Sequence, residues 1–455
     1  MTETNLQKNQ IIRLSCERLG ADLEGVCRHH GLTVFVPGVL PGETFDAKVL
    51  KVQTSYAFAK IERLLMPSPD RREPFCPVYE LCGGCSGQHM TYALTLDAKR
   101  QQVYDGLTRI GGLSLTQSDV PPVIGAENPA RCRNKASLPA SGSAQSPALG
   151  FYRRRSHDLV DIADCPVTLH SLTGVIASVK QWMREHGVAP YDELTHQGFL
   201  RHVVVRANRG GDTLAVLVAT ADTLPAKDAL VSLLQKNAPG FQGLHISENK
   251  SKGNVILGDT SRKLHGADTI SETLLGLTFE ITPLSFFQVN PGQAEALYQK
   301  AIEFANLSSG DLVVDAYAGA GTISLCMAKH CRQVIGLEIV PQAVESAKRN
   351  AQINGIANAE FLTAAVEIEL PRLLSGGLRP DVVVLDPPRK GVEQPVIDAL
   401  LSSKSRRIVY VSCHVPTQAR DIQKLTDGGY RFIACQPVDM FCYAGGVENV
   451  VCLEI

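Results

Sequence analysis

The sequence predicts a multidomain protein: a small OB-like β-barrel at the N-terminus, a central α+β domain, and a C-terminal α/β domain built on a parallel sheet. At 455 residues the chain is too long for one hydrophobic core and suggests roughly two to four domains. Short strand-like runs separated by Gly and Pro turns occupy the N-terminal part, as in a small barrel. From about residue 275, near-continuous apolar runs alternate with amphipathic segments, which is typical of parallel strands covered by helices on both faces.

The composition indicates an ordinary globular protein, with 44% hydrophobic and 20% charged residues. No stretch approaches the roughly eighteen consecutive apolar residues that can span a bilayer, and the opening MTETNLQKNQ lacks the basic and then apolar pattern of a signal peptide. We therefore expect a cytoplasmic protein without membrane contacts, and we expect it to be a monomer. The formal net charge of -1 gives no overall argument for nucleic-acid binding.

The predicted barrel domain spans residues 1–66. Within residues 9–64, Val, Phe, Thr and Tyr alternate with polar residues, which is the pattern of half-buried strands. The stretch PGVLPGE interrupts these runs as a turn would. MPSPDRREP then follows as a linker to the next domain.

The predicted central domain spans residues 67–274. Strand-like runs such as HVVVRANR and TLAVLVAT mostly alternate with helix-like ones such as LTGVIASVKQWMREH, which is an α+β pattern. Three basic clusters lie here, at residues 131–137, 151–158 and 201–209. A single charge run is usually a solvated face, but three of them around aromatic residues favour an RNA or DNA surface.

The cysteines point to a second kind of site. Thirteen of them are many for a cytosolic chain, where stable disulfides are disfavoured. Those scattered in apolar runs are explained as small buried hydrophobes, but packing does not explain three closely spaced thiols on the Gly-rich loop CPVYELCGGC. This loop supplies Cys76, Cys82 and Cys85, and Cys165 lies far downstream. Four thiolates suit either zinc or an iron–sulfur cluster, although the C-x5-C-x2-C spacing is unusual for a zinc ribbon.

The predicted C-terminal domain spans residues 275–455 and contains a ligand-binding pattern. The strand-like VVDAYAGAGT runs into a turn where Gly319 and Gly321 let the backbone approach a ligand closely. Glu338 ends the next strand-like run, where an acidic residue accepts hydrogen bonds from ribose hydroxyls. Without a third glycine to seat a pyrophosphate, S-adenosylmethionine fits better than a dinucleotide. In DPPR, Asp386 precedes two prolines that fix a rigid loop over the ligand.

A thiol follows the next strand-like run, VYVSC, and strand order predicts that Cys413 lies at the same sheet edge as Asp386. Methyl transfer to oxygen or nitrogen needs no covalent help, whereas C5 of uracil is barely nucleophilic. A thiolate added to C6 makes C5 an enolate carbon that can accept a methyl group. A base must then remove the C5 proton, and Glu448, on a glycine turn before the last strand, is the carboxylate that the sequence offers. By itself such a glutamate would more often be a solvated turn residue.

Six motifs together give a more specific indication: SFFQVN, DAYAGAGT, GLE, LDPPR, VYVSC and a C-terminal GGVE. In this combination the chain resembles the RNA uracil-5-methyltransferase family over essentially its full length, with a Rossmann-like methyltransferase domain and a barrel similar to the TRAM RNA-binding domain. The resemblance implies Cys413 as nucleophile and Glu448 as base. It implies a 4Fe–4S cluster, rather than zinc, on the four cysteines. It also implies five contacts with S-adenosylmethionine, from Gln288, Tyr317, Thr322, Glu338 and Asp386.

Two stretches depart from the family pattern. His414 follows the nucleophile where the family often has Asn. Near the base the family usually shows FPHTxHxE, whereas FCYAGGVE places Cys442, Tyr443 and Gly446 at the Pro and His positions. Loss of the imidazoles would change proton handling or substrate subclass. Glu448 is kept, so we expect the same chemistry.

These observations predict methylation of C5 of a specific uridine in 23S ribosomal RNA, with the target base flipped out to reach the thiol. A transfer RNA is the alternative substrate, although the barrel and the cysteine cluster resemble the ribosomal members more. A catalytically silent RNA-binding or ribosome-assembly protein is a further alternative. A radical S-adenosylmethionine enzyme would need C-x3-C-x2-C, which the cysteine cluster does not supply. We expect six basic side chains to contact RNA phosphates: Arg131, Arg133, Lys135, Arg153, Arg154 and Arg155.

Overall fold

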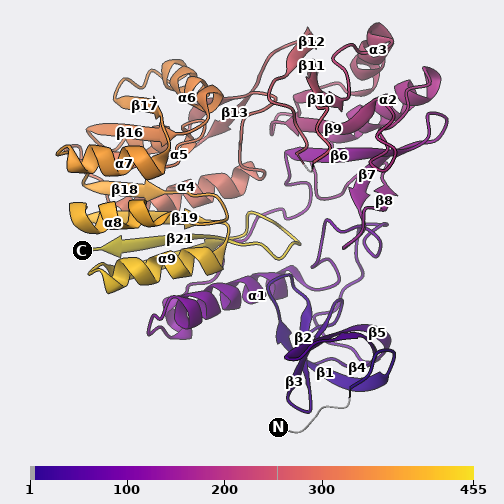
Figure 1. Ribbon diagram of the computed structural model, residues 1–455, viewed down its shortest axis with the longest axis horizontal. Helices are drawn as coiled ribbons and strands as arrows, with labels where there is room; N and C mark the ends of the chain where they lie inside the picture. The colour runs from indigo at the N-terminus through magenta and orange to yellow at the C-terminus, as the bar shows by residue number, and fades with distance from the viewer. Residues whose placement is uncertain (1–5, 254) are drawn as a thin grey trace.

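The structure, a computed structural model, describes residues 6–253 and 255–455 of the chain. Residues 1–5, which the sequence prediction included in the barrel domain, lie outside the described residues. Figure 1 shows a small barrel, a sheet with helices on one side, and a second sheet with helices on both sides. Within the described ranges, no helix is both long enough and apolar enough to cross a bilayer.

The N-terminal barrel closes from five strands in the order β1-β2-β3-β5-β4. Along most of β1 every second residue is buried, because one face of the strand packs inward while the other faces water. Leu14, Val34, Phe45 and Ala57 lie in the interior. The predicted small β-barrel is therefore confirmed. Its strands are β1 Ile11–Leu19, β2 Gly25–His29, β3 Leu32–Val36, β4 Thr44–Val52 and β5 Tyr56–Met66.

The central α+β part is a seven-stranded sheet in the order β12-β11-β10-β9-β6-β7-β8, with helices α2 and α3 packed on one face. Trp182 of α2 is fully buried against this sheet. The elements are β6 Lys135–Gly142, β7 Pro147–Tyr152, β8 Leu159–Asp161, α2 Leu172–Glu185, β9 Leu200–Ala207, β10 Thr213–Ala219, α3 Lys227–Asn237, β11 Phe241–Glu248 and β12 Arg262–Gly266.

Helix α1, Tyr92–Asp105, precedes the central sheet in the sequence but packs elsewhere. Its residue Val103 belongs to the core of the C-terminal domain, together with Leu107 of the short π-helical turn Gly106–Ile110. A 3-10 turn, Gln117–Asp119, follows. The chain thus contacts the C-terminal domain once before it forms the central sheet, and α1 lies between that domain and the barrel (Figure 1).

The C-terminal domain is built on a seven-stranded sheet in the order β17-β16-β15-β18-β19-β21-β20. Only β21 runs antiparallel to its neighbours, so the predicted parallel sheet is confirmed for the other strands. The strands are β15 Leu312–Asp315, β16 Gln333–Glu338, β17 Ala359–Thr363, β18 Val382–Leu385, β19 Arg407–Ser412, β20 Arg431–Val438 and β21 Glu448–Glu454.

Helices cover both faces of the C-terminal sheet (Figure 1). Helices α4, α5 and α6 pack on one face, together with the hairpin of β13 and β14, and α7, α8 and α9 pack on the other with α1. These elements are β13 Ile270–Leu274, β14 Leu277–Ile281, α4 Pro291–Ala305, α5 Thr322–Ala328, α6 Pro341–Ile353, α7 Val366–Ser375, α8 Gln394–Ser403 and α9 Val415–Asp427.

Candidate active site

The polar residues predicted from the sequence meet at one edge of the C-terminal sheet. Glu338 ends β16, and Asp386 and Cys413 directly follow β18 and β19; Asp315, which was not among the residues predicted for the site, ends β15 beside them. These strands are parallel, so their carboxyl ends share an edge. Glu448 begins β21, and because β21 is antiparallel its first residue lies at this same edge.

The glycine turn between β15 and α5 shapes the middle of this edge. Gly319 and Gly321 have φ angles of 54° and 79°, which favour glycine. A Cβ on Gly321 would approach the Phe361 ring to 3.0 Å, whereas a Cβ on Gly319 would meet nothing within 4 Å. The Gly319 N–H donates to Glu338 Oε2 at 3.0 Å, and the Val340 N–H donates to Glu338 Oε1 at 2.8 Å. The acidic residue is therefore fixed beside the turn.

Two adjoining cavities lie at the turn. The first, of about 340 Å³, is lined by Gly319, Glu338 and residues of the β16–α6 connection. The second, of about 30 Å³, extends toward β18, and both are lined by Phe286, Gly319 and Ala320. Six of the seven predicted cofactor residues therefore line one or the other of these two cavities, whereas Gly321 lies against Phe361. Those six are Gln288, Tyr317, Gly319, Thr322, Glu338 and Asp386.

The smaller cavity contains carboxyl groups that resist ionisation. Burial raises the pKa of Asp315 to about 6, although Ser324 Oγ donates to its Oδ2 at 2.5 Å. Burial, and then the charge of Asp315, raise the pKa of Asp386 to about 7. Asp315 Oδ1 and the Tyr317 hydroxyl are buried and have no hydrogen-bond partner among the described residues. Clustered buried carboxyls and unpaired polar atoms favour a ligand that is cationic and polar, as a sulfonium is.

Sheet register places the thiol beside the glutamate. Ser412 of β19 pairs with Asn449 of β21, so the preceding residue Glu448 lies next to Cys413. Burial raises the pKa of the Cys413 thiol to about 11, with further contributions from Glu448 and Asp386. Burial, and then Asp386, raise the pKa of Glu448 well above its ordinary value. The thiol and the two carboxyls form one compact, mutually repelling group.

His414, the departure next to Cys413, makes its hydrogen bonds at the start of α9. It is the N-cap residue of α9, and its N–H donates to Ser412 Oγ at 3.0 Å. Its Nδ1 lies 2.9 Å from Thr417 Oγ1, on the first turn of the same helix. In these contacts the side chain supports the start of α9 and does not replace a proton carrier at Glu448.

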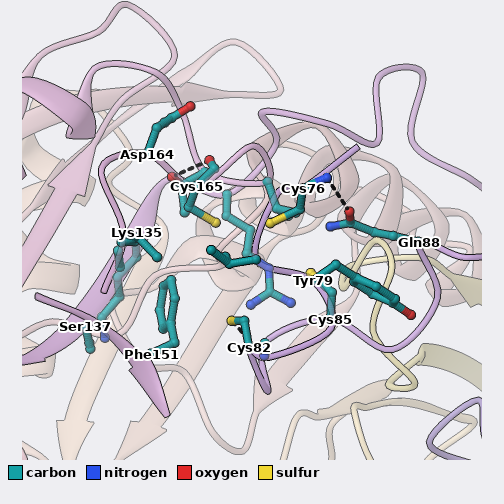
Figure 2. Close-up of a pocket in the computed structure, with 17 residues that line it drawn as sticks. Cys76, Tyr79, Cys82, Cys85, Gln88, Lys135, Ser137, Phe151, Asp164 and Cys165 are labelled. Atoms are coloured by element: carbon teal, nitrogen blue, oxygen red, sulfur yellow. Dashed lines mark hydrogen bonds between the residues drawn. The ribbon is translucent and has the colours of Figure 1, made fainter. Parts of the chain in front are cut away.

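The four predicted metal-binding cysteines line one cavity of about 260 Å³ in the central part of the chain. Figure 2 shows the sulfur atoms of Cys76, Cys82, Cys85 and Cys165 around a common space. Within the described residues, no group of three or more His, Cys, Asp or Glu side chains converges closely enough for a single metal ion. A lone zinc ion needs four sulfurs about 2.3 Å from one point. The lining of this cavity also includes Gln88, Arg133 and Asp164, and its four thiols are donors that either zinc or an iron–sulfur cluster would use.

Comparisons with known proteins agree with this architecture. A family model described as tRNA (Uracil-5-)-methyltransferase matches residues 265–455, and a TRAM domain model matches residues 6–61. The chain is 42% identical over 451 residues to an uncharacterized RNA methyltransferase of Halalkalibacterium halodurans. This match covers 99% of this chain and 98% of that protein. A Listeria monocytogenes protein with the same description is 41% identical over 456 residues, 100% of each chain. The chain belongs to the RNA uracil-5-methyltransferase family.

This methyltransferase also resembles a solved member of the family. The crystal structure of Pyrococcus abyssi tRNA (uracil-54, C5)-methyltransferase in complex with S-adenosyl-L-homocysteine superposes with a TM-score of 0.76 and 28% sequence identity. The match covers 97% of this chain and 100% of that chain. The family and this neighbour identify S-adenosylmethionine as the methyl donor of the methyltransferase described here.

The basic residues predicted to contact RNA divide into two groups. Arg131 pairs with Asp164 through two hydrogen bonds of 2.7 and 2.5 Å, and Arg133 and Lys135 line the cysteine cavity. Burial lowers the pKa of Lys135 to about 8. Arg131 is therefore engaged within the protein, whereas Arg133 Nε is buried and has no hydrogen-bond partner among the described residues.

The other three, Arg153, Arg154 and Arg155, are exposed in the turn after β7. The Arg154 side chain donates to the Cys85 carbonyl, and the Arg155 guanidinium lies 5.0 Å from the centre of the Phe58 ring in the barrel. This exposed run connects the cysteine loop with the barrel.

Sequence reasoning did not identify Tyr298 of α4, which lines the smaller cavity with Asp386. Its hydroxyl lies 3.1 Å from Thr322 Oγ1. A tyrosine in an amphipathic helix gives no signal of its own, but its position shortly after SFFQVN could have suggested it.

Proposed function

We propose that this methyltransferase methylates C5 of a uridine in RNA through a covalent adduct between Cys413 Sγ and C6 of the base. The observation that supports this most directly is the register of β19 and β21, which places Glu448 beside Cys413 at the edge that contains Asp386. A nucleophile and a base on neighbouring strands can act on C6 and C5 of one pyrimidine. Because the site is buried, the target base would have to be flipped out of its stack to enter.

The proposed steps balance in atoms and charge. The Cys413 thiol loses its proton to solvent, and the resulting thiolate adds to C6 while the electron pair of the C5–C6 double bond moves into the C4 carbonyl to give an enolate. C5 then attacks the methyl group, and S-adenosylhomocysteine leaves. Glu448 removes the C5 proton, the double bond re-forms, and the C6–S bond breaks. Arg389, whose charge lowers the pKa of the Cys413 thiol, favours the first step.

We also propose that the residues lining the two cavities hold the methyl donor. Glu338 would accept hydrogen bonds from the ribose, and Gln288, Tyr317, Thr322 and Asp386 would surround the rest of the molecule. In the central domain, Cys76, Cys82, Cys85 and Cys165 would hold a 4Fe–4S cluster. Bound there, such a cluster would cross-link the cysteine loop to the strand region near Cys165 and could exchange an electron. Zinc is the alternative occupant.

For the substrate we propose 23S ribosomal RNA in the cytoplasm, because the barrel is combined with the four-thiol cavity. A transfer RNA is the second candidate. It is favoured by the Pyrococcus abyssi enzyme, a tRNA (uracil-54, C5)-methyltransferase whose entire chain matches this one. That match weakens the argument from architecture, since a transfer-RNA enzyme shares the whole domain order.

The covalent mechanism predicts opposite results for two variants. Cys413→Ala should reduce methyl transfer on the order of 10⁴-fold or more, because C5 is not activated without the adduct, while S-adenosylmethionine still binds. Glu448→Gln should transfer the methyl group but retain the RNA covalently, visible as a slow band on a denaturing gel. Methyl transfer by Cys413→Ala near the parent rate would end the nucleophile proposal. Transfer by Glu448→Gln without an adduct would require another base.

The substrate proposal predicts where 5-methyluridine disappears. Mass-spectrometric mapping of RNA from a strain lacking the gene should show one or more unmodified uridines in 23S ribosomal RNA and an unchanged content in transfer RNA. Restoring the gene should restore the modification, whereas restoring Cys413→Ala should not. Loss confined to transfer RNA would establish the second candidate instead.

A further inference from the structure

The segment between β20 and β21, residues 439–447, directly precedes Glu448 in the active site. Val438 of β20 pairs with Glu448, so the segment is a closed loop whose last residue precedes the proposed base. Glu448 is buried and is the first residue of β21, so the path of the backbone that precedes it helps to set its position. What holds residues 439–447 therefore determines where the base lies.

Helix α1 holds the beginning of this segment. Lys99 is fully buried, and its Nζ donates to Asp439 Oδ1 and, at 2.9 Å, to the Phe441 carbonyl. The Tyr92 hydroxyl donates to Asp439 Oδ2 at 2.6 Å. Helix α1 thus binds both a side chain and a backbone carbonyl of the segment.

The loop that contains the cysteines holds the middle of the segment. The N–H groups of Ser86 and Gly87, which directly follow Cys85, donate to the Tyr443 carbonyl at 2.7 and 2.9 Å. The Phe75 ring packs edge-on against the Tyr443 ring at 5.2 Å between centroids. Tyr443 itself has a φ of 58°, an uncommon value for a residue with a side chain, so outside contacts are needed to fix it.

Simple stabilisation is the competing explanation for Lys99. A buried ion pair contributes little net stability relative to apolar residues of similar size, because both charges lose their hydration. Its more specific effect is geometric: Lys99 Nζ joins Asp439 and the Phe441 carbonyl, two points of one loop that make no regular secondary structure. These contacts restrict the path of the backbone toward Glu448.

We propose that Lys99 is a positioning residue for the base: with Ser86 and Gly87 it fixes residues 439–447 so that Glu448 can reach the C5 proton of the methylated adduct. The inference rests on the proposed role of Glu448. The step that depends on Lys99 is proton removal with release of the product. Cofactor binding and methyl transfer do not depend on Lys99.

The test is Lys99→Met, which keeps the length of the side chain and removes its charge. The release of methylated RNA should slow by about 10- to 100-fold, since a displacement of about 1 Å is costly at a reacting group. The covalent adduct should accumulate, and S-adenosylmethionine affinity should stay within about twofold. Amide hydrogen exchange in residues 441–448 should be faster than in the parent protein.

Two further variants separate positioning from stability. Lys99→Met combined with Asp439→Asn leaves no unpaired buried charge, so the thermal midpoint should recover while product release stays slow. If release recovers together with the midpoint, Lys99 acts only through stability and the proposal is overturned. Lys180→Met is the matched control, because Lys180 also pairs with an aspartate, Asp161, and donates to a carbonyl, but lies in α2. It should release product at the parent rate.

Glu448→Gln distinguishes the two proposals. If that variant forms no adduct, the role of Glu448 itself is wrong, whatever Lys99→Met does. If Glu448→Gln accumulates adduct while Lys99→Met releases product at the parent rate, only the positioning inference fails.

Discussion

At the scale of single residues, the active site is a group of acids kept close to neutrality by burial. Asp315 and Asp386, with pKa values raised to about 6 and about 7, are both mostly uncharged near pH 5 and both mostly ionised near pH 8. Glu448 and the Cys413 thiol have raised pKa values for the same reason. The negative charge that appears as pH rises makes the site more receptive to a cation.

This titration predicts a pH-dependent preference for the methyl donor over the demethylated product. S-adenosylmethionine carries a sulfonium charge that S-adenosylhomocysteine lacks. Its affinity relative to S-adenosylhomocysteine should therefore rise about three- to tenfold from pH 5.5 to pH 8, measured by calorimetry. Asp386→Asn should flatten this rise, because it removes one titrating carboxyl. A ratio that is constant across the range would show that these carboxyls do not interact with the sulfonium.

The sequence allowed prediction of residues that end or begin strands, and missed residues inside helices. Asp386 and Cys413 follow apolar runs that have one plausible secondary structure, so their shared edge could be inferred before the fold was known. Lys99 and Tyr298 lie in the interior of helices, where a polar side chain usually indicates a solvent-facing position. Only tertiary packing shows that both are buried. Likewise, nothing in RCRNKAS shows that Arg131 is engaged by Asp164.

At the scale of secondary-structure elements, the parallel strands were predictable because buried parallel strands are continuously apolar. The reversed direction of β21 could not be predicted, since an apolar run such as NVVCLEI does not encode the direction of its strand. That reversal places Glu448 at the catalytic edge. The docking of α1 on the C-terminal domain also escaped prediction, because its sequence follows the cysteine loop directly.

The cysteine loop supports a prediction about metal content. Protein purified without oxygen should contain about four iron atoms per chain and absorb visible light. Cys165→Ser should reduce the iron content, whereas Cys326→Ser should not, because Cys326 is buried in the C-terminal core away from the cavity. Both variants should bind S-adenosylmethionine as the parent does. One zinc ion per chain and no iron would replace the cluster proposal with the zinc alternative.

At the scale of the whole molecule, contacts made by a few residues join the three units. The exposed Arg153–Arg155 run bridges the cysteine loop and the barrel, and residues 86 and 87 bridge that loop and the segment before Glu448. The order of the three units was predictable from composition and turn patterns. The contacts between them were not, since they involve backbone groups and single side chains that leave no periodic pattern.

The position of β21 in its sheet has a consequence for how the enzyme is made. Among the described elements β21 is the last to leave the ribosome, yet it lies between β19 and β20 in the finished sheet. Until it inserts, a nascent chain exposes two unpaired strand edges and has a thiol without its neighbouring glutamate. An incompletely synthesised chain therefore lacks the assembled catalytic edge.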